Sequence, residues 1–114
     1  MLFEEVIPDF TKICSLTELK EGIGKRFEVN GIDIAVFRVE QEVFAINNVC
    51  THLHKSILCD GFLEDGFVIC PAHGWEFNLK DGKRPKNRRG VDSYLTEIRN
   101  GDVFVKVFEK RVNY

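Results

Sequence analysis

The sequence predicts an all-β protein built as a small antiparallel sandwich or barrel. Four dipeptides typical of tight hairpin turns divide its 114 residues at short intervals: Asn30-Gly31, Asp65-Gly66, Asp81-Gly82 and Asn100-Gly101. Both central residues of such turns need positive φ, which these residue types adopt most readily. The runs between the turns are rich in Val, Ile and Phe, and several alternate with the period of two of a half-buried strand. Turns and runs together favour antiparallel sheets.

The apolar runs give the expected strands in chain order. They read "RFEV" (26–29), "IDIAVFRV" (32–39), "EVFAI" (42–46), "GFVIC" (66–70), "WEFNL" (75–79), "YLTEIR" (94–99) and "DVFVKVFE" (102–109). Only the segment "SLTELKEG", from Ser15 to Gly22, predicts a helix. Ser15 suits its N-cap, Glu18 lies three residues further on, and Gly22 suits its end.

Length and composition favour one globular domain over residues 1–114. Hydrophobic residues make up 44% and charged residues 30% of the chain, as in ordinary globular proteins. Acidic residues stand near the N-terminus, where a secretory signal would carry basic ones. No apolar stretch approaches the length that spans a bilayer. We therefore expect a cytoplasmic protein that makes no membrane contact.

The net charge of −2 conceals an uneven distribution. Residues 1–79 hold 6 basic and 13 acidic side chains, whereas residues 80–114 hold 10 basic and 5 acidic ones. A nucleic-acid-binding domain is usually basic overall and carries a recognisable motif, so we expect no nucleic-acid partner. The basic run 83–89 is either a solvated loop or a docking patch for an acidic partner, whose effect would weaken with salt.

Two short segments each place a cysteine and a histidine at the end of an apolar run. The first, "NVCTHLHKS", contains Cys50-x-His52, and the second, "CPAHGWEFN", contains Cys70-x-x-His73. Both pairs should lie on loops that leave strand ends, where a rigid scaffold can hold ligands together. Thiolate sulfur and imidazole nitrogen are donors for zinc and for iron–sulfur clusters. Metal binding is therefore favoured over two disulfides, which belong mainly to secreted proteins.

Two kinds of metal site fit these four donors. Zinc sites typically take two cysteines from one turn and two histidines from another, whereas here each loop supplies one of each. This distribution suits a [2Fe–2S] cluster, because each loop can send its sulfur to one iron and its nitrogen to the other. We therefore expect a [2Fe–2S] cluster with Cys50, His52, Cys70 and His73 as ligands, and zinc is the alternative.

The segments "CTH" and "CPAHGW" resemble the Rieske family. The likeness extends to "ELKEG", "FAINNVCTH", "GFLEDGFVICPAHGWEFNLKDGK" and "GDVFVKV", so it covers most of the chain. The resemblance implies the Rieske fold, an antiparallel β-sandwich with a cluster-binding subdomain at about residues 46–80. It implies that Cys50 and Cys70 bind the inner iron, and that His52 and His73 bind the exposed iron.

The resemblance is to small Rieske-type ferredoxins, which implies a one-electron carrier. It also implies a flavoprotein reductase as donor and a terminal ring-hydroxylating oxygenase or similar redox enzyme as acceptor. The chain should not be an oxygenase itself, since that needs a second iron on two histidines and a carboxylate, and only His54 remains. Three alternatives stay open: a Rieske-like small subunit of nitrite reductase, a redox-sensing module, and a zinc-bound interaction domain. Nitrite reductase subunits of this kind often lack the four ligands that this chain has.

The ligand set predicts the redox potential. Two neutral imidazoles in place of two thiolates leave the oxidised cluster nearly neutral, which makes an added electron less costly, and such clusters span about −150 to +300 mV. In high-potential relatives, two hydroxyl groups bind the cluster sulfurs and a disulfide joins the loops. By the resemblance, those positions are occupied here by Trp75 and Phe77, and by Lys55 and Ala72. A potential near the low end is expected.

Other residues near the motif have expected roles apart from metal binding. We expect His54 to be a solvent-facing loop residue, and Pro71 and Gly74 to shape the second loop and leave N–H groups for the cluster. Trp75 is expected in the core on the same face as Phe77, although it could also stack near a partner. Cys14, in an expected strand, and Cys59 are expected to be packing thiols rather than a redox pair or spare ligands.

Overall fold

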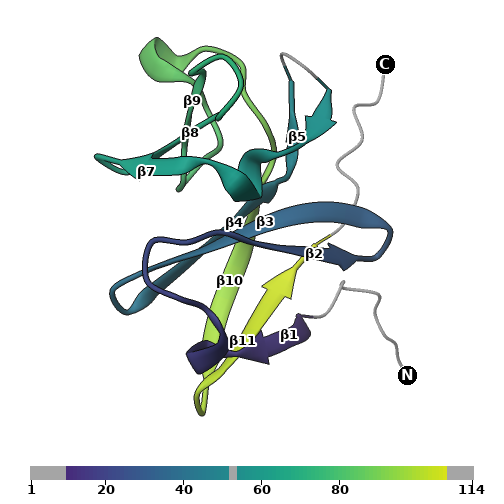
Figure 1. Cartoon of the computed structure of the whole chain (residues 1–114). Helices are drawn as coiled ribbons and strands as arrows, with labels where there is room; N and C mark the ends of the chain where they lie inside the picture. Colours follow the sequence, from purple (N-terminus) through teal and green to yellow (C-terminus); the bar gives the residue numbers. More distant parts are fainter. Residues whose placement is uncertain (1–9, 52–53, 108–114) are drawn as a thin grey trace.

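The computed structural model describes residues 10–51 and 54–107, and its main element is a six-stranded antiparallel sheet. The strand order of this sheet is β1-β11-β10-β4-β3-β2. Figure 1 shows it as a strongly twisted body below two smaller sheets. Its strands are β1 (Thr11–Ser15), β2 (Lys25–Val29), β3 (Ile32–Val39), β4 (Glu42–Asn47), β10 (Ser93–Arg99) and β11 (Asp102–Lys106). The predicted all-β, antiparallel class is confirmed.

β3 and β4 are buried on both faces, which explains why "IDIAVFRV" reads as an almost continuous apolar run. Side chains alternate between the two faces of a strand. Ile34 and Val36 therefore join one core with β10 and β11, whereas Ala35 and Phe37 join a second core. The second core lies between the six-stranded sheet and the smaller sheets, so it sits directly beneath both Cys/His segments.

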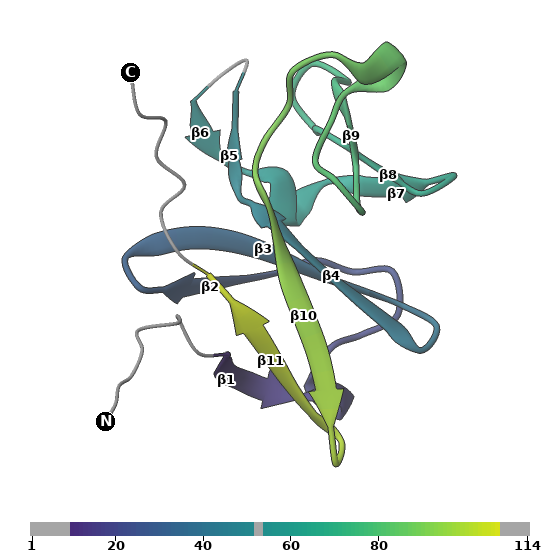
Figure 2. The same ribbon diagram turned by 180° about the vertical axis from the view of Figure 1, so that it is seen from behind.

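The two smaller sheets lie together at one end of the molecule, as both views show (Figures 1 and 2). One pairs β5 (Val49–Cys50) with β6 (Lys55–Ser56), and the other has the order β7-β8-β9, with β7 at Phe62–Glu64, β8 at Phe67–Ile69 and β9 at Glu76–Asn78. A 3-10 turn, η2 (Leu58–Asp60), connects the two sheets. Gly61 follows it and packs closely on β8, because a Cβ there would meet Ile69 O at 2.6 Å. Within the described residues, no helix has the length and apolar character needed to cross a membrane.

The predicted helix from Ser15 to Gly22 is wrong beyond its first turn. Only η1 (Leu16–Glu18) forms, as a 3-10 helix, although the Ser15 N–H does donate to Glu18 Oε2 at 3.0 Å. The chain leaves the helix because Leu19 turns into the core, with 2% of its surface exposed. Gly22 then adopts φ +74° and donates its N–H to the Arg38 carbonyl at 2.8 Å, beside β3. Tertiary contacts outweigh the local capping signal.

Three of the four predicted turns have the expected backbone. Asn30-Gly31, Asp65-Gly66 and Asn100-Gly101 all have positive φ at both residues and close two-residue hairpins. At the fourth, only Gly82 has positive φ, and the loop runs on to β10 through η3 (Pro85–Asn87). The Lys83 N–H donates to the Asp81 carboxylate at 2.9 Å, a local turn that replaces the hairpin.

Candidate metal centre

The first Cys/His segment forms the tip of the β5–β6 hairpin. Cys50 ends β5, faces Lys55 across the pair, and has no exposed surface. The Cys50 carbonyl accepts the N–H of His54 at 2.6 Å, and His54 has φ +57°. His54 is exposed, as predicted. His52 lies outside the described residues.

The second segment connects β8 to β9. Cys70 follows β8 directly and is 1% exposed, whereas Pro71, Ala72 and His73 form an exposed turn. The Cys70 N–H donates to the Trp75 carbonyl at 2.7 Å, which closes the base of the turn. Its carbonyl accepts the N–H of Gly74 at 3.0 Å, so this N–H binds the loop's own backbone. That other N–H groups of the loop face the cluster stays a prediction.

The two segments share one backbone pattern. In each, the cysteine carbonyl accepts the N–H of the residue four positions later, and that residue has left-handed φ. The residue is His54 in the first loop and Gly74 in the second, with φ +57° and +76°. Each cysteine carbonyl therefore closes a single turn. In the second loop, the intervening Pro71, Ala72 and His73 are exposed. The motif spacings differ by one residue, so this likeness is not visible in the sequence alone.

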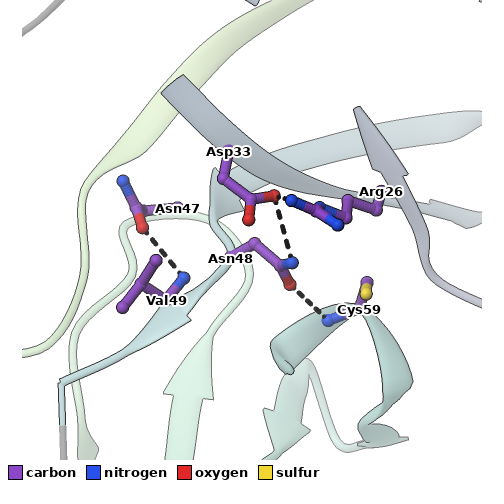
Figure 3. Close-up of polar contacts among 6 residues, drawn as sticks. All are labelled: Arg26, Asp33, Asn47, Asn48, Val49 and Cys59. Carbon is purple, nitrogen blue, oxygen red and sulfur yellow. Dashed lines mark hydrogen bonds and ion pairs between the residues drawn. The ribbon is translucent and has the colours of Figure 1, made fainter. Parts of the chain in front are cut away.

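Asn48 fixes the approach to the first loop, a role that no motif in the sequence indicated. It has no exposed surface and is the buried polar residue of the described core. Its Nδ2 donates to Asp33 Oδ1 at 3.1 Å, and its Oδ1 accepts the N–H of Cys59 at 2.7 Å (Figure 3). Its backbone N–H also donates to the Asp33 carbonyl, at 2.9 Å. Asn48 thus joins β3, the loop entry and η2.

Asp33 secures both sides of the same loop from the body of the molecule. Burial tends to raise its pKa, but hydrogen bonds from the side chains of Ser56, Arg26 and Asn48 outweigh burial and hold the pKa below its ordinary value. Asn48 precedes the loop and Ser56 follows it in β6. Arg26 Nε approaches Asp33 Oδ1 at 2.9 Å. The carboxylate is therefore kept ionised at the base of the hairpin.

The structure brings the two cysteines that we predicted as ligands into one hydrophobic core. Cys50 and Cys70 belong to the same buried cluster, together with Phe37, Phe77 and Leu79. His73 lies on the exposed turn that follows Cys70. In the described part of the chain, which leaves out His52, no three His, Cys, Asp or Glu side chains form a metal-binding group.

Comparison with known proteins identifies the family of this chain. Residues 9–108 match the model of the Rieske [2Fe-2S] domain. The chain belongs to the Rieske family. Its cofactor is accordingly a Rieske-type [2Fe–2S] cluster.

Three relatives of this Rieske protein illustrate the range of its resemblance. The ferredoxin component of the naphthalene 1,2-dioxygenase/salicylate 5-hydroxylase systems of Ralstonia sp. is 34% identical over 94 residues, which are 81% of this chain and 89% of the relative. A chain in the complex of reduced oxygenase and oxidized ferredoxin of carbazole 1,9a-dioxygenase is 28% identical, with a TM-score of 0.75, and the match covers 90% of this chain and all of that one. The nitrite reductase [NAD(P)H] small subunit of Erwinia carotovora is also 28% identical, with a TM-score of 0.75, and the match covers 92% of this chain and 86% of that one.

The donor set of this Rieske protein fits its cofactor. Two thiols are enclosed by apolar side chains, and one imidazole is exposed on the adjoining turn. A cluster held there would have a dry sulfur-ligated side and a side near solvent. Trp75 and Phe77 provide no hydroxyl group to it. Phe77 is fully buried, as expected, whereas Trp75 is only half-buried and packs against the edge of the second core.

The two remaining cysteines are consistent with packing roles. Cys14 lies in β1 and is 6% exposed, and burial raises the pKa of its thiol. Cys59 lies in η2 and is partly buried, and burial also raises the pKa of its thiol. A raised pKa keeps a thiol protonated at neutral pH, which makes it less nucleophilic and a weaker metal donor. Cys59 packs against the second hydrophobic core, which contains Cys50 and Cys70.

Proposed function

We propose that this Rieske protein is a one-electron carrier whose cluster is held by Cys50, His52, Cys70 and His73. The observation that carries the proposal is the burial of Cys50 and Cys70 in one apolar cluster beneath an exposed His73. When bound, the cluster takes up and releases one electron at a time. The buried cysteines keep water from the sulfur-ligated side, and the exposed imidazole provides an edge that a partner can approach.

We further infer that residues 1–114 form one domain, with a cluster-binding subdomain at about residues 46–80. The separate β5–β6 and β7–β9 sheets, which carry both loops, support this division. The second core joins them to β3 through Ala35 and Phe37, so the subdomain has no hydrophobic core of its own. It should fold only together with the six-stranded sheet.

The proposed partners are a flavoprotein reductase as electron donor and a terminal oxygenase as acceptor, acting in the cytoplasm. The Ralstonia relative supports this assignment, because it is named as the ferredoxin component of a dioxygenase system. The carbazole dioxygenase structure supports it further, because it is a complex of an oxygenase with a ferredoxin. The protein would then carry electrons for an oxygenase without being an enzyme itself.

A second candidate is the small subunit of a nitrite reductase, since the Erwinia carotovora subunit resembles this chain at 28% identity. The two functions differ in the partner required. A carrier should exchange electrons with a separate reductase as a free protein, whereas a subunit should copurify with the large chain of its enzyme. Size-exclusion chromatography of the protein from its native cells distinguishes them.

Ligand replacement tests the proposed site. We expect the anaerobically purified protein to contain iron and inorganic sulfide in equal amounts and to absorb visible light. The single variants Cys50→Ser, Cys70→Ser, His52→Asn and His73→Asn should each lose most of this absorption. Cys14→Ser and Cys59→Ser are matched controls that should retain it. Full retention in any of the first four variants, or loss in a control, would contradict the assignment.

A further inference from the structure

The loop between β9 and β10 carries a dense group of positive charges, which we call the basic rim. The rim contains Lys80, Lys83, Arg84, Lys86, Arg88 and Arg89. It lies close to the β8–β9 turn that carries His73, which we call the second ligand loop; the first ligand loop is the Cys50 segment. Asp81 is the acidic residue among residues 80–89, so the net charge of this segment is +5. All of the rim cations except Arg84 are exposed. In Figures 1 and 2 the loop lies at the same end of the molecule as the β8–β9 turn.

The rim is held in a fixed shape by its own backbone. Arg84 and Arg88 exchange two hydrogen bonds, of 3.0 Å and 3.2 Å, across the turn that contains η3. The base of the loop is closed by the Val91 N–H, which donates to the Gly82 carbonyl at 2.9 Å. Gly90 approaches Gly82 so closely that a side chain on it would collide with the Gly82 carbonyl. A fixed loop loses little conformational entropy when a partner binds.

Arg84 attaches the rim to the second ligand loop. Its guanidinium carbon lies 3.4 Å from the centroid of the Trp75 ring. Trp75 follows His73 by two residues. In the described part of the chain, Arg84 Nε is buried without a hydrogen-bond partner, so the indole face is the contact that holds this group. Gly74, Trp75 and Glu76 line one shallow depression with Arg84, Pro85, Lys86 and Arg88. The cations therefore border the loop that carries His73.

None of the rim cations forms an ion pair within the described chain, although Asp81 and Asp92 line one depression with Lys83, Arg88 and Arg89. The ion pairs in residues 10–51 and 54–107 are Lys12–Asp102, Arg26–Asp33 and Arg99–Glu97, and none includes a rim residue. Concentrated like charges raise the electrostatic energy of the free protein, and an oppositely charged surface relieves this repulsion. The position beside His73 points to a protein that exchanges electrons, because transfer to the centre requires close approach there.

We propose that the basic rim is the docking surface for an acidic redox protein, which approaches the second ligand loop over Lys86 and Arg88. This inference rests on the proposed electron-carrier function and adds the chemical character of one partner. Attraction between the rim and a carboxylate-rich surface speeds the encounter and orients His73 toward the redox group of the partner.

Electron transfer to a protein probe of known charge tests the proposal. The purified protein is reduced with dithionite, freed of excess reductant, and mixed in a stopped-flow instrument with the acidic haem protein cytochrome b5 or the basic haem protein cytochrome c. In each case the Rieske centre loses one electron and the ferric haem gains it. We expect the rate with the acidic probe to fall as ionic strength rises, since salt screens the attraction.

Matched charge reversals locate the effect. Lys86→Glu and Arg88→Glu should each slow the reaction with the acidic probe several-fold at low salt, and should leave the rate with the basic probe equal or higher. The control is Lys20→Glu, which makes the same change in charge at an exposed residue between η1 and β2, outside both Cys/His segments. It should change either rate by less than about twofold.

Three outcomes would overturn the proposal: a rate that does not depend on salt, an equal effect of Lys20→Glu and Lys86→Glu, or rim-dependent binding of a DNA duplex at physiological ionic strength. The absorption spectrum of each variant is recorded first. A colourless wild-type protein would refute the electron-carrier function itself. A normal spectrum with rates that ignore the rim charges would refute only the docking surface.

Discussion

The side-chain amide of Asn48 donates to the carboxylate of Asp33 at 3.1 Å and fixes the entry to the first ligand loop from the body of the molecule. The other side of the same amide accepts the N–H of Cys59 at 2.7 Å. One fully buried side chain therefore joins β3 to η2, two residues before Cys50. Positioning of this loop depends on a buried polar contact as well as on the apolar core.

Removing the Asn48 amide should loosen the loop. Asn48→Ala leaves the partly buried Cys59 N–H without its acceptor, which costs about 1–3 kcal/mol. The melting temperature should fall by about 5–15 °C, and less cluster should survive purification. Asn78→Ala is the control, because its Oδ1 accepts the N–H of the exposed Lys80, which water can bind instead. Equal melting temperatures for the two variants would contradict the role of Asn48.

Asp33 should make part of the stability depend on acid pH. Its pKa is lower in the folded protein than in the unfolded chain. The ionised carboxylate therefore stabilises the fold at pH values above the ordinary Asp pKa of about 3.9. This contribution is lost as the pH falls through the lowered pKa. The difference in melting temperature between wild type and Asp33→Asn should therefore be largest above about pH 5 and shrink below about pH 4. A difference that stays constant with pH would argue against it.

Replacing His54 with glycine, the residue at the equivalent position of the second loop, tests whether His54 is a ligand. His54 has φ +57° and Gly74 has φ +76°, a region that costs a non-glycine residue about 1 kcal/mol. His54→Gly relieves that strain at some cost in unfolded-chain entropy. We expect full visible absorption and a melting temperature within a few degrees of wild type. Loss of the absorption would make His54 a ligand in place of His52.

Gly82 should be far less tolerant of a side chain than Gly101, although both have positive φ. A Cβ on Gly101 meets nothing within 4 Å, whereas one on Gly82 would collide with the Val91 carbonyl. Gly101→Ala should cost about 1 kcal/mol from its backbone alone. Gly82→Ala should cost about 1–3 kcal/mol more, because the backbone must move. Thermal unfolding measures both, and similar costs would show that the base of the basic rim is looser than described.

The sequence predicted the fold correctly where local residue types largely determine the backbone conformation, as in hairpin turns and long apolar strands. The hairpins at Asn30-Gly31 and Asn100-Gly101 formed as expected, and "IDIAVFRV" became β3 with the expected bounds. The helix after Ser15 was overestimated, because burial of Leu19 and the contact of Gly22 with β3 are long-range effects that no capping pattern contains. The short strands β5, β6 and β7 were missed for a similar reason, since two or three residues show no periodicity.

The residue types of the candidate site were predictable from the sequence, whereas the residues that position its loops were not. Cysteine and histidine at strand ends indicated a metal centre, and the burial of Cys50 and Cys70 in one cluster agrees with that prediction. Asn48 and Asp33 carry no such signal, because a single Asn or Asp has many possible environments. The stacking of Arg84 on Trp75 likewise depends on two segments that only the tertiary fold brings together. Residues that position a ligand loop are therefore found from the structure.

Pulsed EPR of the dithionite-reduced protein, produced with 15N-labelled histidine, shows directly whether His52 and His73 bind a [2Fe–2S] cluster. We expect a [2Fe–2S] signal coupled to two inequivalent nitrogens, with one coupling lost in His52→Cys and the other in His73→Cys. Removing either imidazole should also lower the potential toward the roughly −400 mV of all-cysteine clusters. A cluster signal with no histidine nitrogen coupling, or a colourless protein that contains zinc and no inorganic sulfide, would contradict this ligand assignment.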